Sequence, residues 1–161
     1  ATAAIGVQVT GVNDAPELFA PTSVNVKSGA NVLVRNVSVS DVDVGETFGA
    51  MLETTITPSS GAVSVTRFGG LNFVAGSGGG GASAGSSGSA DNRSPTFAQL
   101  HFFAAQAATN QALASLAYHA TGACGTQSIT IVVNDGGYTG ASRNTPGAPL
   151  SATKMITVHC V

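Results

Sequence analysis

Charged side chains are scarce in this sequence, and tryptophan is absent. Of the 161 residues 9% are charged, and the formal net charge is -2. Proteins that bind nucleic acid need a basic patch or stripe to neutralise phosphates, and this sequence has none. No apolar run approaches the roughly 20 residues that a membrane-spanning helix requires. The sequence therefore predicts neither a nucleic-acid partner nor insertion into a membrane.

Apolar residues alternate with Ser, Thr and Gly along most of the chain, as they do in half-buried β-strands. Turn signals of Gly, Pro, Asn and Asp separate these segments. The expected strands are residues 22–27, 31–39, 49–57, 61–66, 96–103, 127–134 and 154–160. Residues 104–116 contain good helix formers without Pro or Gly, which predicts one short crossover helix between strands. The pattern as a whole predicts an all-β, Ig-like antiparallel β-sandwich.

The first residues of the chain form a surplus strand that this sandwich does not need. Ile5, Val7 and Val9 alternate with small or polar residues, and an acidic linker follows them. We expect residues 1–12 to be a donor strand, 13–20 a linker and 21–161 the sandwich domain, with a Gly/Ser-rich insertion at 76–94.

Two cysteines are present, and the expected strand pairing brings them together. If residues 127–134 and 154–160 form an antiparallel hairpin, Cys124 lies beside Cys160, which favours a disulfide. The alternative of two buried free thiols stays open. A disulfide predicts an extracellular or cell-surface location, because such bonds persist in oxidising compartments.

Two glycosylation sequons agree with this location. They are Asn36-Val-Ser and Asn92-Arg-Ser, the second of which is followed by Pro95. An N-x-Ser/Thr sequon accepts glycans on the surface of a secreted chain. Such sequons also arise by chance in a Ser-rich sequence, so this alternative stays open as well.

The few acidic residues are concentrated in turns. Six of the eight lie in three turns: Asp14 and Glu17 in the linker, Asp41, Asp43 and Glu46 in the next turn, and Asp135 after a late strand. Carboxylate, amide and carbonyl oxygens are the ligands that Ca²⁺ prefers, and loops between strands supply them readily. Asp is also simply a good turn former, which is the competing interpretation.

Five short motifs, taken together, resemble the cadherin-like repeat domains that occur in tandem in large secreted adhesins and surface proteins. In order they are Val-Asn-Asp-Ala-Pro, Val-Ser-Val-Ser-Asp-Val-Asp-Val-Gly-Glu, Gly-Leu-Asn-Phe, Asn-Gln-Ala-Leu-Ala-Ser-Leu-Ala-Tyr and Ile-Thr-Ile-Val-Val-Asn-Asp-Gly-Gly. The resemblance implies a cadherin-like sandwich in an extended fibre or stalk, with calcium at linkers and turns. The residues that match those positions are Asn13, Asp14, Asp41, Asp43 and Asp135.

These observations predict a structural subunit of an extracellular filament, with other copies of itself as partners. The N-terminal strand, through Ile5, Val7 and Val9, would add to the sheet of the next copy, head to tail. One alternative is a repeat of a calcium-stiffened tandem adhesin array. Another is a carbohydrate-binding module, for which Tyr138 is the aromatic residue to test.

No catalytic residues are predicted. Residues 76–85 match G-x-S-x-G and G-x-G-x-x-G, but these matches lie in a low-complexity tract without the strand-turn-helix setting that the chemistry requires. His101, His119 and His159 lack metal-binding spacing and are expected to be packed or surface residues. Calcium and glycans are the only ligands that the sequence suggests.

Overall fold

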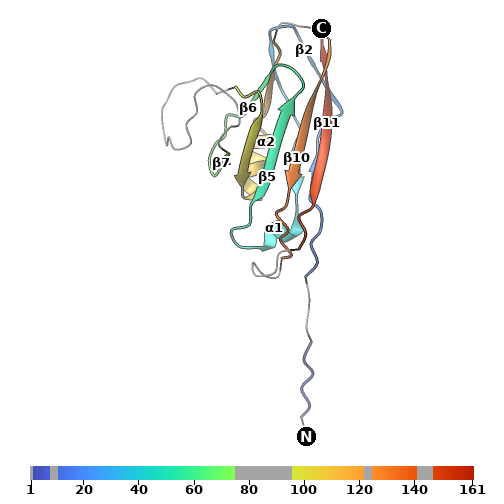
Figure 1. Ribbon diagram of the computed structural model, residues 1–161, viewed down its shortest axis with the longest axis vertical. Coiled ribbons are helices and arrows are strands. Elements are labelled where there is room, and N and C mark those ends of the chain that lie inside the picture. Colours follow the sequence, from blue (N-terminus) through green and yellow to red (C-terminus); the bar gives the residue numbers. More distant parts are fainter. Residues whose placement is uncertain (1, 8–10, 75–95, 122–124, 141–146) are drawn as a thin grey trace.

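A computed structural model describes residues 2–7, 11–74, 96–121, 125–140 and 147–161. The fold is mostly β, with mixed sheets and two short helices (Figure 1). The Gly/Ser-rich insertion predicted at residues 76–94 lies outside the described residues. Neither described helix is long and apolar enough to cross a membrane.

One layer of the fold is a six-stranded sheet. Its strands, in spatial order, are β2 (Ser23–Val26), β11 (Ser151–Cys160), β10 (Thr126–Asn134), β5 (Leu52–Pro58), β8 (Leu100–Ala104) and β7 (Asn72–Phe73). All neighbours are antiparallel except β2 and β11, which are parallel. The two predicted strands 127–134 and 154–160 are present as β10 and β11, and they form the antiparallel hairpin on which the cysteine argument was conditional, with pairs from Asn134↔Ser151 to Thr126↔His159.

The second layer consists of two smaller sheets. The first has the strand order β3 (Asn31–Leu33), β9 (Ala117–His119) and β6 (Ala62–Ser64). The second pairs β1 (Glu17–Phe19) with β4 (Ser38–Ser40). Since β1 lies within residues 13–20 and Leu18 is buried, the end of the predicted linker belongs to the folded domain.

The core lies between these layers and follows from the alternation in the sequence. Ile129, Ile131 and Val133 of β10 point inward, and so do Val63 of β6 and Tyr118 of β9. Burying each such side chain contributes about 1.5–3 kcal/mol.

Two helices connect the strands. The predicted crossover helix is confirmed as α2 (Gln106–Leu113), between β8 and β9. The side chain of Asn110 bonds both the N–H and the C=O of Val39, which fixes α2 against β4. A second helix, α1 (Val42–Glu46), occupies the acidic segment that the sequence indicated only as a turn.

Residues 2–7 extend away from the sandwich at the end where α1 lies, and we call this end the base (Figure 1). These residues form no strand and are exposed. Residues 2–7 of the predicted surplus strand are therefore not part of this chain's own sheets, and residues 8–10 lie outside the described residues.

Candidate functional site

Three segments far apart in the sequence meet at the base. They are the N-terminal segment around Asn13, helix α1 with Asp41 before it, and the turn that follows β10 (Figure 1). Each carries predicted calcium ligands. The fold thus gathers the acidic residues that the sequence distributes over the chain.

Asp135 organises the turn after β10. Its side chain is fully buried, and Oδ1 accepts hydrogen bonds from the N–H groups of Gly137 at 2.7 Å and Leu150 at 2.8 Å. Gly136 and Gly137 have φ values of 72° and 80°, which explains the Gly-Gly pair because this region suits glycine. Asp135 therefore joins the two ends of the connection between β10 and β11.

Asn13 attaches the N-terminal segment to this turn. Its amide nitrogen donates to Asp135 Oδ2 and to the backbone oxygen of Ala148, both at 2.9 Å. The amide oxygen of Asn13 is buried and has no hydrogen-bond partner. An oxygen left in this way is available to a cation.

Asp43 and Glu46, both in α1, form the other side of the site. Asp43 is 6% exposed, and its Oδ2 accepts from the N–H of Asp14 at 2.7 Å. A Cβ added at Gly140 would lie 3.1 Å from Asp43 Oδ1 and 3.2 Å from Glu46 Oε2. Both oxygens thus face the same small space beside a residue without a side chain.

Asp41 caps α1 and lies near two other carboxylates. Its Oδ1 accepts from the N–H of Val44 at 2.8 Å, as an N-cap residue does. Its Oδ2 is buried without a partner. Burial raises the pKa of Asp41, and the charges of Asp135 and Asp43 raise it further, while the hydrogen bond from Val44 opposes the increase.

Among the described residues, no cationic side chain forms an ion pair with the carboxylates at the base. Asp41, Asp43 and Asp135 are all buried, and within the described ranges the one ion pair joins His101 to Glu53 elsewhere in the fold. Buried charges are normally paired or bound to metal. A bound cation or protonation of Asp41, whose pKa is raised, would each reduce this buried charge.

The donor set suits calcium in its chemistry. All the candidate atoms are carboxylate or amide oxygens, which Ca²⁺ and Mg²⁺ bind and softer metals avoid. However, no three His, Cys, Asp or Glu side chains in the described part of the chain already enclose a metal position. Several of these oxygens also accept N–H bonds, so binding would require them to rearrange.

The other predicted site residues have separate positions. Asn36 is exposed, and its φ of 60° lies in the left-handed region that Asn tolerates, which gives it a turn role whether or not it carries a glycan. Asn92, Cys124 and Val9 lie outside the described residues. The N–H of Cys160 donates to the oxygen of Gly125 at 3.1 Å, so the chain next to Cys124 runs beside Cys160.

A polar network that the sequence did not reveal crosses the three-stranded sheet. His119 Nε2 lies 2.6 Å from Ser64 Oγ, and its Nδ1 lies 2.7 Å from Asn31 Oδ1. This order of groups resembles a catalytic triad. Ser64 is only 2% exposed, so its hydroxyl is not open to a substrate, and we interpret the network as a clamp on β3, β9 and β6.

This network makes stability depend on pH. Burial lowers the pKa of His119 below 6.5, so the unfolded chain takes up a proton before the folded one does. We expect the free energy of unfolding to fall as pH drops below about 6.5, with a slope of at most about 1.4 kcal/mol per pH unit for one proton. Urea denaturation from pH 8 to 5 measures this loss. His119→Gln should remove it, and an unchanged pH profile in that variant would show that another group is responsible.

No protein-family model, curated protein or solved structure matches this chain.

Proposed function

We propose that this chain is a structural module of an extracellular fibre, joined head to tail through its N-terminal segment. The proposal rests on the solvent exposure of the apolar side chains in residues 2–7. Ile5 is 89% exposed and Val7 is 82% exposed, although both are large apolar residues at alternate positions of an extended segment. When such a segment adds to the sheet edge of another copy, its backbone forms hydrogen bonds with that edge and its apolar side chains are buried.

The attachment at the base supports this role. Asn13 and Asp14 bond to Asp135 and Asp43, so the chain is tied to the sandwich immediately after the proposed donor strand. The N-terminal segment therefore leaves the module from a fixed point at the base. A contact of this type repeats from copy to copy without closing into a dimer.

A second candidate is a repeat of a calcium-stiffened tandem array. It is favoured by the three buried carboxylates at the base without a cationic partner among the described residues. Ca²⁺ bound there would hold the N-terminal segment to α1 and to the turn after β10. The two candidates share this calcium site and differ in whether the preceding module lies in another chain or in the same one.

The proposed location is the cell exterior. A disulfide between Cys124 and Cys160 fits the hydrogen bond between Cys160 and Gly125, and the exposed Asn36 can carry a glycan. A carbohydrate-binding role has less support, because the ring of Tyr138 is partly buried against the core. Stacking on a sugar needs an exposed aromatic face.

Electron microscopy of the purified chain, with and without residues 1–12 and in calcium or chelator, tests the proposal. We expect filaments from the full chain and single particles from the truncated one, since truncation removes the donor strand but keeps Asn13 and Asp14. Shorter or more curved filaments in chelator would support a stiffening role for calcium. Single particles from the full chain under all conditions would reject assembly between chains and leave the tandem array.

A further inference from the structure

Among the described residues, no strand is paired with residues 151–156 of β11 on the side where β2 pairs, so this stretch has a free edge. On one side β11 pairs with β10 along nearly its whole length, but on the other side β2 pairs only with Thr157–Cys160. Within the described residues, 151–156 therefore have one strand neighbour instead of two. An edge of this kind offers unpaired N–H and C=O groups to another strand.

The backbone groups that point to this edge can be identified. The N–H of Thr157 donates to Thr22 on the β2 side, whereas the N–H of Cys160 donates to Gly125 on the β10 side. The backbone N–H and C=O groups of successive residues point to opposite edges of a strand. Those of Thr153 and Met155 therefore point to the same edge as those of Thr157. Their N–H and C=O groups thus face the free edge.

Across from this edge, β1 also has an unpaired side. Val39 directs its N–H and C=O to Asn110, so Ser38 and Ser40 are the residues of β4 that bond to β1. By alternation, Leu18 directs its own N–H and C=O away from β4. Two unpaired backbone edges therefore border the same space. Cα atoms of β1 come within 8 Å of β11, whereas a strand between them needs about 9.6 Å, so β1 has to move outward when a strand enters.

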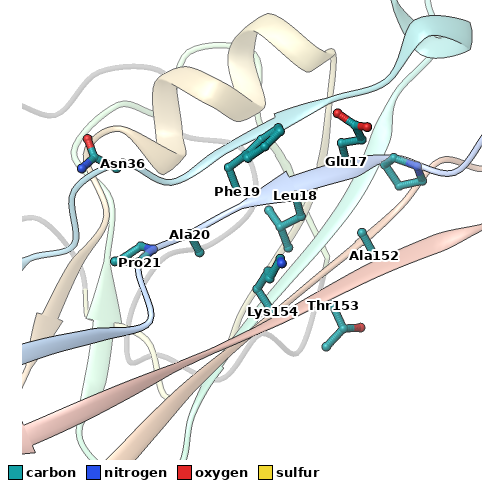
Figure 2. Close-up of a pocket in the computed structure, with 10 residues that line it drawn as sticks. Glu17, Leu18, Phe19, Ala20, Pro21, Asn36, Ala152, Thr153 and Lys154 are labelled. Carbon is teal, nitrogen blue, oxygen red and sulfur yellow. The ribbon is translucent and has the colours of Figure 1, made fainter.

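That space is a groove of about 740 Å³ between β1 and β11 (Figure 2). Leu18, Ala20 and Ala152 give it an apolar floor, and Lys154 points into it from β11. A lysine on an edge limits indiscriminate strand pairing, and its long side chain can move aside for a matching strand. The groove lies alongside residues 152–154 of β11, on the same edge where β2 pairs with Thr157–Cys160.

We propose that this groove receives residues 2–7 of a second copy as an added strand along β11. The inference rests on the proposed head-to-tail assembly and names its acceptor. The donor segment matches the free edge of residues 151–156 in length and carries no charge that would be buried beside Lys154. Ile5 and Val7 would face the apolar floor, while Gly6, with open space around it, would face outward.

The occupant comes from another copy because of where the donor begins. Asn13 and Asp14 are held at the base, and residues 2–7 point away from their own sandwich (Figure 1). Each copy then has one donor and one acceptor, which is what a filament requires.

Two variants separate donor from acceptor in the full-length chain. The donor variant, Ile5→Asp with Val7→Asp, changes exposed side chains only. The acceptor variant, Thr153→Pro, removes an N–H that faces the free edge and leaves the bonds to β10 in place, and prolines are tolerated at such edges. Ala152→Trp is a second acceptor variant that fills the floor of the groove without removing any backbone donor. Thermal melting checks that each variant folds.

Sedimentation of the wild type, of each variant alone and of a donor–acceptor mixture tests the inference. We expect each variant to weaken self-association on the order of a hundredfold, as central interface residues do. The mixture should form one-to-one dimers, because only one intact donor and one intact groove remain. Filaments from both folded acceptor variants would overturn the groove while leaving strand-mediated assembly intact. A monomeric wild type would overturn both the groove and the strand-mediated assembly. A donor variant that still assembles would also overturn both.

Discussion

Replacing Asp135 with alanine is expected to lower the free energy of unfolding by about 3–4 kcal/mol, even in chelator. The buried carboxylate accepts hydrogen bonds from Gly137, Leu150 and Asn13, so its removal leaves three N–H donors without an acceptor. Urea denaturation in EDTA measures the change.

Asp135→Asn is the matched control. It keeps an oxygen for the N–H groups of Gly137 and Leu150, but its amide nitrogen would oppose that of Asn13. We expect a loss of about 1 kcal/mol, which is the scale of a single hydrogen bond. If the alanine variant were as stable as the asparagine one, the turn after β10 would not depend on these bonds.

Calcium is expected to raise the free energy of unfolding of the wild type by about 2 kcal/mol at roughly fifty times its dissociation constant. For an extracellular module that constant is about 0.1–1 mM. The physical reason is the buried negative charge of Asp41, Asp43 and Asp135, which lacks a described cationic partner. Calorimetry in calcium and in EDTA measures the shift, with magnesium as a comparison.

Asp41→Asn sharpens this test, because asparagine keeps the Oδ1 atom that caps α1 and replaces the unpartnered, charged Oδ2 with a neutral amide nitrogen. The pKa of Asp41 is raised in the folded state, so wild-type stability in chelator falls as pH rises from 3.8 through that higher pKa. At neutral pH the variant should therefore be more stable than the wild type in chelator.

In calcium the same variant should gain less than half the wild-type increment, since tenfold weaker binding removes about 1.4 kcal/mol. Equal increments in both proteins would place the ion away from Asp41. No increment in either would remove calcium from the proposed function.

The strands with long alternating patterns were predictable from the sequence. Alternation over residues 127–134 and 154–160 predicted β10 and β11, because one face of each strand must be buried, while their antiparallel pairing was only assumed in the cysteine argument and is observed in the structure. The run of helix formers at 104–116 likewise predicted α2, although the helix spans only Gln106–Leu113 and β9 begins at Ala117, directly after the stretch.

Three short strands and helix α1 were not predicted. β1, β7 and β9 have at most three residues, which is too short for a period to be recognised. Helix α1 contains Asp43 and Gly45, both weak helix formers, and it is held by the cap from Asp41 and by the buried side of Val44. Tertiary contacts rather than local preference stabilise these elements.

The sequence by itself determined the residue types of the candidate site, the amphipathic strands and the unpaired apolar residues near the N-terminus, because these depend on local composition and periodicity. Only the tertiary structure decided which groups meet. The contact of Asn13 with Asp135 spans 122 positions in the sequence, and the free edge of β11 exists because the chain moves from one layer to the other between β1 and β2. Both depend on long-range packing, which no local pattern encodes.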